Sequence, residues 1–313
     1  MHLISDERAT VAGTAIEIKN LTKAFGAVRA VDDLTFTVRP GVVTGFLGPN
    51  GSGKTTTLRM LLGLVAPDSG SATIGGRKYV DIDRPASVVG AALEAASFHP
   101  GRSALDHLRV FAPLAGVADQ RCKDVLEHVG LGPVSDRKVG GFSLGMRQRL
   151  GLATTLLGDP GVLVLDEPSN GLDPEGIVWL RGFLRHLAHD QGRTVLVSSH
   201  VLGEVQATVD DVVVIAGGRL VHESPLQDLV AMAADRVKVV TPDIDGFTRL
   251  AQSRGWQFEV VSGGLHLIGA GPAEVGAAAH AERLEIHGLA GEGKGLEEVF
   301  LELTDPNRSA VAA

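Results

Sequence analysis

The sequence predicts an α/β protein with a mostly parallel core sheet, followed by a smaller α+β domain of ferredoxin-like type. Short apolar runs alternate with helical stretches from Ala15 to about Leu229, which is typical of α/β domains. The runs VLVL from Val162 and VLVS from Val195 are short and continuous, as expected of parallel strands that are covered on both faces. Beyond about Ala234 the expected order becomes β-α-β-β-α-β, which is the ferredoxin-like pattern.

The elements of the larger part follow from these patterns in chain order. Strands are expected at Ile16–Ile18, Leu34–Val38, Val42–Phe46, Val162–Leu165, Val195–Val197 and Val212–Ile215. Helices are expected at Lys54–Leu64, Ala104–Leu114, Lys123–Val129, Ser143–Leu157, Pro174–Asp190 and Val201–Val209. Tight glycine turns among the early strands, such as the one at Gly75 and Gly76, predict a separate antiparallel β subdomain.

The C-terminal part has its own set of elements. Strands are expected at Val237–Val240, Gln257–Val261, Leu265–Ile268 and Leu284–His287, with helices at Phe247–Arg254, Ala273–His280 and Leu296–Leu303. We therefore divide the chain into a leader at 1–14, a larger α/β domain at 15–234 and an accessory domain at 235–313. A helical subdomain is expected at about 95–158 within the second of these parts.

The composition narrows the classes of function. Hydrophobic residues make up 44% of the 313 residues and charged residues 21%, which favours a packed protein over a disordered one. The net charge of −8 argues against a nucleic-acid partner. A single cysteine, Cys122, excludes a disulfide framework within the chain. No stretch approaches the ~20 apolar residues of a membrane-spanning helix, and no signal peptide is recognisable. We therefore expect no direct membrane insertion, and a role at a membrane only through a partner.

A complete phosphate-binding loop follows the expected strand at Val42–Phe46. It consists of Gly48, Pro49, Asn50, Gly51, Ser52, Gly53, Lys54, Thr55 and Thr56, which match the G-x-x-x-x-G-K-[ST] pattern in full. The glycines let backbone N–H groups turn toward phosphate oxygens. Lys54 is expected to bind the β- and γ-phosphates, and the Thr55 hydroxyl to bind Mg²⁺. The alternative is a glycine-rich turn with a surface lysine.

Two acids end the apolar strand in VLVLDE. Asp166 is expected to hold Mg²⁺, directly or through water, and Glu167 to polarise an attacking water. His200 ends VLVSSH, at the carboxyl end of an expected parallel strand, where ligands of α/β proteins bind. It is a candidate γ-phosphate sensor that also orients water. The alternatives are solvated acids at a strand end and a structural or surface histidine.

A second phosphate-binding signal lies far along the chain from the first. In FSLGMRQRL, Ser143 is a hydroxyl residue that suits the N-cap of a helix. A helix start with free N–H groups suits an anion. One chain therefore carries two phosphate-binding signals that are well separated in sequence.

Five motifs together resemble the ATP-binding cassette (ABC) ATPases. The phosphate loop, SLGMRQR, VLVLDEP, NGLDP and VSSH stand in the order and approximate spacing of that family, over about residues 15–230. The resemblance implies a P-loop NTPase of ABC type that hydrolyses ATP with Mg²⁺. It also implies a head-to-tail dimer, in which Ser143 and the Gly145 N–H group touch ATP held by the phosphate loop of a partner chain.

Further site residues take their expected roles from the same resemblance. Asp173, in the D-loop NGLD, would link the two ATP sites across the dimer. Phe25 stands where the family has an aromatic residue that stacks on adenine, and the alternative is an ordinary core phenylalanine. Two positions depart from the family pattern, because Leu144 replaces a glycine and Glu94 replaces a glutamine. Glu94 is expected to bind Mg²⁺ or its water, and the alternative is a solvated loop acid.

The C-terminal segments of the chain point to one subgroup within the ABC ATPases. GRLVHESPLQDLV, the ferredoxin-like segment and LEEVFLELT, over about residues 217–304, look like those of bacterial antibiotic-resistance exporters of the daunorubicin-resistance type. This implies an ATPase subunit at the cytoplasmic face of the membrane, powering efflux of a drug-like or other substrate through a separate permease. Its ATPase partner would be a second copy of itself or a homologous chain. An ABC importer ATPase, and a non-transport ABC protein acting on ribosomes or DNA, are the alternatives.

Overall fold

The computed structural model describes residues 13–93, 98–234, 236–291 and 296–305. The chain divides into two compact units, one that ends at Glu223 and one that starts at Ser224. Helix α7 (Leu226–Ala234) therefore groups with the second unit. The sequence places its boundary after this helix, between residues 234 and 235.

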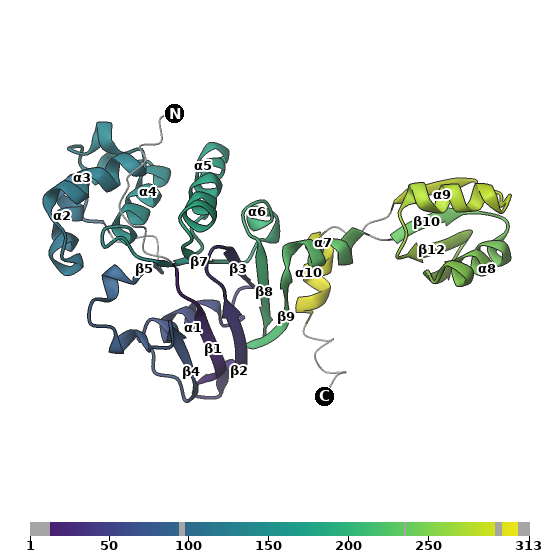
Figure 1. The fold of residues 1–313 in the computed structure, drawn as a ribbon, viewed down its shortest axis with the longest axis horizontal. Coiled ribbons are helices and arrows are strands. Elements are labelled where there is room, and N and C mark those ends of the chain that lie inside the picture. Colours follow the sequence, from purple (N-terminus) through teal and green to yellow (C-terminus); the bar gives the residue numbers. More distant parts are fainter. Residues whose placement is uncertain (1–12, 94–97, 235, 292–295, 306–313) are drawn as a thin grey trace. The chain divides into compact units, whose positions relative to one another are not determined.

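A six-stranded sheet forms the centre of the first unit (Figure 1). Its order is β5-β6-β7-β3-β8-β9, with β5 at Val89–Ala92, β6 at Val162–Asp166, β7 at Thr194–Ser199, β3 at Val43–Leu47, β8 at Asp211–Ala216 and β9 at Arg219–Pro225. All pairs from β5 to β8 are parallel. The four apolar residues of β6 are fully buried. The mostly parallel core that the sequence predicts is therefore confirmed.

A separate antiparallel sheet lies beside the core, in the order β2-β1-β4. Its strands are β1 at Ile16–Phe25, β2 at Val28–Val38 and β4 at Ser69–Ile74. Helix α1 (Lys54–Leu61) follows β3 and shares one buried apolar cluster with both sheets. The rings of Phe36 on β2 and Phe46 on β3 stack with centroids 5.1 Å apart. This packing fixes the antiparallel sheet against the start of the phosphate loop.

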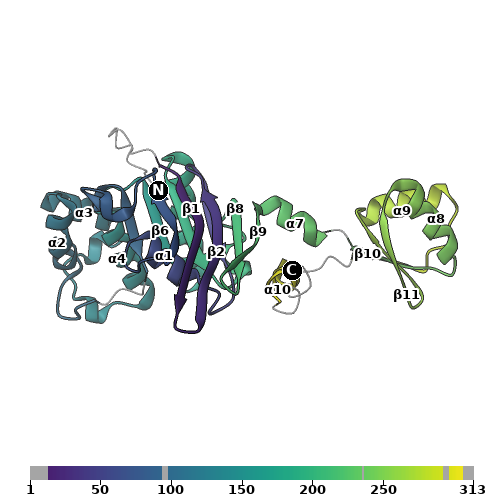
Figure 2. The same cartoon turned by 90° about the horizontal axis from the view of Figure 1, so that it is seen from below.

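Three helices gather on one side of the first unit, namely α2 (Ala104–Ala115), α3 (Asp119–His128) and α4 (Leu144–Thr155) (Figures 1 and 2). Asp159 joins this group to the core, because its carboxylate accepts from Arg121 on α3 at 3.0 Å and from Arg193 before β7 at 2.8 Å. Beyond them lie α5 (Pro174–Arg185), which continues as a π-helical turn at His186–Asp190, and the short α6 (Leu202–Val205). Helix α6 is shorter than the Val201–Val209 helix that the sequence predicts.

The second unit contains the β-α-β-β-α-β order that the sequence predicts. After α7 come β10 (Arg236–Val240), α8 (Ile244–Arg254), β11 (Gln257–Val261), β12 (Gly264–Ile268), α9 (Pro272–Ala281), β13 (Gly288–Gly291) and α10 (Leu296–Thr304). The sheet order is β11-β12-β10-β13, antiparallel throughout. Helices α8 and α9 cover one face of it through a shared apolar cluster (Figure 2). Helix α10 packs against α7.

The last strand of this sheet does not lie where the sequence predicts it. The expected strand at Leu284–His287 precedes the observed β13, which consists of small and apolar residues at Gly288–Gly291. Leu284 and Ile286 pack against the core of the unit. Their alternation therefore reflects partial burial against this core, whereas the edge strand is the following segment, two glycines and an alanine with Leu289 among them. Periodicity alone does not separate these two cases.

Candidate active site

The phosphate loop connects β3 to α1 and bends where glycine is required. Gly51 has φ +80° and Gly53 has φ +105°, values that residues with a side chain rarely adopt. A Cβ atom on Gly53 would clash with the carbonyl oxygen of Ala30, and one on Gly48 would clash with that of Ile215. The loop therefore has the close-packed, left-handed turns that direct N–H groups inward.

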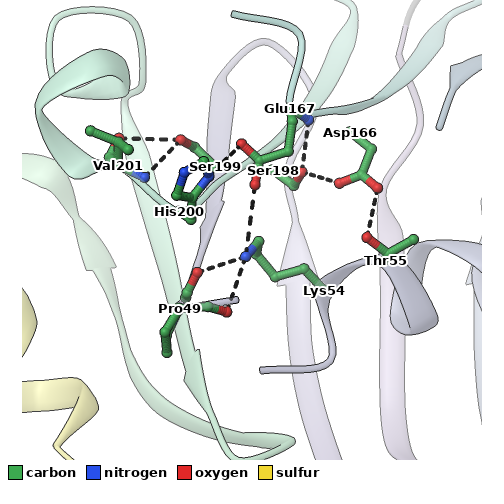
Figure 3. Close-up of polar contacts among 10 residues, drawn as sticks. Pro49, Lys54, Thr55, Asp166, Glu167, Ser198, Ser199, His200 and Val201 are labelled. Atoms are coloured by element: carbon green, nitrogen blue, oxygen red, sulfur yellow. Dashed lines mark hydrogen bonds and ion pairs between the residues drawn. The ribbon is translucent and has the colours of Figure 1, made fainter. Parts of the chain in front are cut away.

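Lys54, the first residue of α1, points into the loop. Its side chain is 7% exposed, and its Nζ donates to the carbonyl oxygen of Gly48 at 2.6 Å and of Pro49 at 3.3 Å. Burial lowers the pKa of Lys54, whereas the charges of Glu167 and Asp166 act in the opposite direction. The surface-lysine alternative is therefore excluded, and the ammonium lies at the centre of the loop (Figure 3).

Ser52 supplies an independent indication that the loop holds a ligand. Its hydroxyl oxygen is buried and has no hydrogen-bond partner in the part of the chain that the structure describes. A buried polar atom without a partner costs free energy. An anion bound in the loop would remove that cost, so the loop fits phosphate by its donors as well as by its shape.

Asp166, the last residue of β6, is held through both carboxylate oxygens (Figure 3). Its Oδ2 accepts from the Thr55 hydroxyl at 2.8 Å, and its Oδ1 accepts from the Ser198 hydroxyl. Thr55 and Asp166 come from segments far apart in the sequence, and their oxygens meet beside the phosphate loop. A carboxylate next to a hydroxyl suits Mg²⁺, which proteins bind with few side-chain oxygens together with substrate phosphates.

Glu167 contacts both Lys54 and His200. Its Oε2 lies 2.9 Å from Nδ1 of His200, and its Oε1 lies 3.8 Å from Nζ of Lys54. Its backbone is left-handed, with φ +50°, which is uncommon for a residue with a side chain. The carboxylate is 20% exposed and the imidazole 34%. The acid predicted to polarise water therefore lies at the edge of the phosphate loop, in contact with the predicted phosphate sensor.

Most of these residues, though not Asp166, line one open pocket of about 530 Å³. It is lined by Ala30, Asn50, Gly51, Ser52, Gly53, Lys54, Thr55, Thr56, Glu167, Asn170 and His200. Most of the phosphate loop, the acid and the histidine thus share one cavity. Backbone N–H groups, an ammonium and hydroxyls on one side face a carboxylate on the other, an arrangement suited to binding a polyphosphate and activating water beside it.

Comparisons with known proteins identify the family. The family model described as ABC transporter matches residues 31–170. The uncharacterized ABC transporter ATP-binding protein YhcH of Bacillus subtilis (strain 168) is 42% identical over 217 residues, covering 69% of this chain and 71% of that protein. The chain belongs to the ABC transporter family of ATP-binding proteins.

Two further comparisons agree with this family. The bacitracin transport ATP-binding protein BcrA of Bacillus licheniformis is 42% identical over 218 residues, covering 69% of this chain and 71% of that protein. A solved structure of the ATP-binding subunit of an ABC transporter is 27% identical with a TM-score of 0.62, covering 69% of this chain and 92% of that one. The chain is thus the ATP-binding subunit of an ABC transporter, an ATPase that uses ATP with Mg²⁺.

The predicted dimer-contacting residues of this ABC ATPase lie outside the pocket that contains the phosphate loop. Ser143 caps α4 by accepting from the Met146 N–H at 3.3 Å. At Gly145, a Cβ would be 3.6 Å from Leu172, which precedes Asp173. Asp173 caps α5, accepting from the Gly176 N–H at 2.8 Å. Within one chain, these residues contact their own helices and the D-loop.

Phe25 and Glu94 are the remaining predicted site residues, and the structure describes only the first of them. Phe25 is 51% exposed, at the end of β1, so it is not a core phenylalanine. Its ring centroid lies 5.6 Å from Nζ of Lys23. Glu94 lies outside the described residues. Ser198 is a site residue that the sequence reasoning missed. The sequence places it near the carboxyl end of an expected strand, but only the structure shows that this strand pairs with β6.

Members of this family work with membrane permease subunits and dimerise. In the described parts of the chain, every helix is too short or too polar to cross a lipid bilayer.

Proposed function

We propose that this chain hydrolyses ATP in a head-to-tail dimer, with each ATP bound between the phosphate loop of one subunit and helix α4 of the other. One observation carries the proposal. The phosphate loop and Glu167 share one pocket, whereas Ser143 and Gly145 at the start of α4 do not line it. The helix start offers N–H groups and the positive end of a helix dipole. A second subunit allows both phosphate signals to act on one nucleotide.

The pocket residues have separate roles in this proposal. Backbone N–H groups of the phosphate loop, among them those of Gly51 and Gly53, bind the phosphates together with the Lys54 ammonium, and Phe25 stacks on the adenine. Thr55 and Asp166 hold Mg²⁺, with Glu94 as a further candidate. When bound, Mg²⁺ supplies positive charge that neutralises the phosphate oxygens during transfer.

Hydrolysis then depends on the paired Glu167 and His200. The Glu167 carboxylate accepts a proton from the attacking water, which is oriented in line with the terminal phosphate. His200 keeps Glu167 in place through the 2.9 Å contact with Nδ1, and its side chain lines the pocket. The family resemblance implies that Asp173, which caps α5 at the end of the D-loop, links this event to the second site of the dimer.

Lys54 lies within reach of both the loop and the acid. Its ammonium donates to two loop carbonyl oxygens, and the Glu167 carboxylate lies 3.8 Å away. Phosphate oxygens are stronger acceptors than neutral carbonyls. Phosphates in the loop would therefore compete with these carbonyl oxygens and with Glu167 for the ammonium.

The transport direction we propose is export, through a separate permease at the cytoplasmic face of the membrane. Two features support export. BcrA, at 42% identity, is named as a bacitracin transport ATP-binding protein. The second unit has the β-α-β-β-α-β order that belongs to the resemblance to antibiotic-resistance exporters. We propose that residues 15–234 form the ATPase domain and residues 235–313 an accessory domain. Drug-like substrates are the proposed cargo class.

Affinity purification of the tagged full chain from its own membrane fraction tests this assignment. Recovery of an integral membrane permease without a substrate-binding protein is the result expected for an exporter. Recovery of a permease together with a substrate-binding protein would indicate an importer. Recovery of ribosomes or DNA would contradict a transport role. The Lys54→Ala variant is the matched control. Because it should lose ATP binding, the amount of permease recovered with it should differ from wild type if permease binding depends on ATP.

A further inference from the structure

Ser198 lies between the two acidic residues of the site without belonging to the phosphate loop or the pocket lining. It is fully buried and stands in β7, directly opposite Asp166 in the parallel pairing of β6 with β7. Figure 3 shows its side chain between the side chain of Asp166 and the backbone of Glu167. No motif discussed above gives this residue a role.

The Ser198 hydroxyl is the donor in one hydrogen bond and the acceptor in another. It donates to Oδ1 of Asp166 and accepts from the backbone N–H of Glu167 at 3.0 Å. A hydroxyl has one donor and two acceptor lone pairs, so both bonds can form at once. Because Thr55 donates to the other oxygen of Asp166 at 2.8 Å, the carboxylate is held on both sides and cannot rotate without breaking a bond.

The same hydroxyl supports a strained backbone. Glu167 has φ +50°, and such a conformation persists only where surrounding contacts enforce it. Its N–H is bound by Ser198, its carbonyl oxygen accepts from Asn170 N–H at 3.1 Å, and its carboxylate contacts His200. Of these three contacts, the one with Ser198 also connects Glu167 to Asp166, because the same hydroxyl donates to the Asp166 carboxylate.

We propose that Ser198 is a positioning residue that fixes the Mg²⁺-binding carboxylate of Asp166 and the backbone of Glu167 relative to each other. It touches neither ATP nor the attacking water, and it acts through its two neighbours. The inference rests on the proposed roles of Asp166 and Glu167. Loss of the hydroxyl leaves Asp166 free to rotate about one bond and leaves the Glu167 N–H without its partner.

A purely structural role for Ser198 makes a different prediction. Removing a buried hydroxyl that serves only folding would lower the melting temperature and leave the response to Mg²⁺ unchanged. Thr194 provides the matched control, because it is buried at the other end of β7 and its hydroxyl donates to the Thr14 carbonyl oxygen at 2.8 Å. Thr194→Val removes a hydrogen bond from the same strand, far from Asp166.

The test compares full-length wild type with Ser198→Ala, Ser198→Thr and Thr194→Val. We would measure kcat, KM for ATP, the Mg²⁺ concentration for half-maximal turnover, and the melting temperature. Binding of a fluorescent ATP analogue, with EDTA and with Mg²⁺, gives a readout independent of turnover. For Ser198→Ala we expect kcat to fall and the Mg²⁺ requirement to rise, each about tenfold, as for other residues that orient metal ligands. Analogue affinity in EDTA should stay at the wild-type value.

The other variants decide between the two roles. Ser198→Thr keeps the hydroxyl and should recover most of the lost turnover, whereas Thr194→Val should lower only the melting temperature. An Mg²⁺ response of Ser198→Ala equal to that of wild type, in an enzyme that turns over ATP, would overturn the inference while leaving the proposed function intact. Absence of Mg²⁺-dependent turnover in wild type would instead reject the proposed function. If Ser198→Ala does not fold, failure of Ser198→Thr to show wild-type Mg²⁺ dependence overturns the inference.

Discussion

The Leu144 side chain covers Gly171, so closely that a Cβ atom on the glycine would clash with Cδ2 of the leucine. Leu144 begins α4 and Gly171 lies in the D-loop with φ +74°. A second link is adjacent, because Nε2 of Gln148 on α4 donates to the Asn170 carbonyl oxygen at 3.1 Å. The leucine that departs from the family signature therefore connects the start of α4 to the D-loop within one chain.

This contact predicts non-additive effects of substitution. Gly171→Ala should lower the melting temperature of the first unit by about 4–8 °C, the shift expected for ~2 kcal/mol in a domain of this size. Part of that loss comes from the left-handed backbone and part from the Leu144 clash. In a Leu144→Ala background only the backbone part should remain, so the loss should be about half as large. Equal losses in the two backgrounds would show that Leu144 does not restrict position 171.

Glu167→Gln should keep ATP binding and lose hydrolysis. The amide cannot accept the water proton, so turnover should fall about 100-fold or more. Because ATP persists between the subunits, light scattering after size-exclusion chromatography should show a dimer with ATP and a monomer with ADP. Normal turnover in this variant would remove Glu167 as the base.

Lys54→Ala should weaken nucleotide binding by about tenfold or more, because charged hydrogen bonds to phosphate are lost. Equilibrium binding of a fluorescent ATP analogue measures the change. Lys123→Ala is the control for net charge, since that side chain is 52% exposed on α3 and forms only a loose ion pair. Equal affinities for wild type and Lys54→Ala would reject the phosphate-loop assignment.

Ser143→Ala should lower turnover while the dilute monomer still binds ATP as wild type does. The variant also loses an N-cap, which costs about 1 kcal/mol. Ser103→Ala separates the two effects, because Ser103 caps α2 in the same way, accepting from the Asp106 N–H at 3.0 Å. Both variants should melt earlier, and only Ser143→Ala should lose turnover. Weaker ATP binding by the monomer of Ser143→Ala would argue against a site shared between chains.

His107 should make the helical part of the first unit sensitive to acid. Burial, with a smaller contribution from Arg102, lowers the pKa of His107, whose ring lies between those of Phe98 and Phe111 at 4.9 and 5.1 Å. The unfolded chain therefore binds a proton more readily than the folded one. Stability contributed by the neutral ring is complete above the unfolded pKa of about 6.5 and decreases as pH falls below it.

The check is the melting temperature of wild type and His107→Leu between pH 7.5 and 5. The difference between them should shift in favour of the leucine variant as the solution becomes more acidic. A constant difference over this range would show that His107 does not titrate differently on unfolding.

Local motifs allowed much of the site to be predicted, because their spacing carries the chemistry. The phosphate loop needs glycine where φ is positive, and Asp166 and Glu167 stand at the end of a fully apolar, buried run. Ser198 was missed because its role depends on which strand lies next to β6, and pairing of distant strands is not visible in one sequence. The contact of Leu144 with Gly171 is likewise tertiary.

The fold shows the same division between local and non-local information. Most strands of the core sheet and the β-α-β-β-α-β order of the second unit could be predicted from alternating patterns, whereas β4, β9 and α7 were not among the expected elements. The edge strand at Gly288–Gly291 was not predicted, because three of its four residues are glycine or alanine, which have low strand propensity. Pairing with β10 places the segment in the sheet.

The position of Ser198 within β7 restricts which insertions and deletions the gene can tolerate. Successive strand residues face opposite sides of a sheet, and here Ser198 faces Asp166 while the Ser199 hydroxyl contacts Val201 backbone atoms. Loss or gain of one codon between Thr194 and Ser198 would exchange these two faces without changing the composition of the strand. Single-codon insertions or deletions in this stretch should therefore be eliminated by selection, even though the neighbouring serine keeps a hydroxyl in the strand. The surface turns between strands can vary in length.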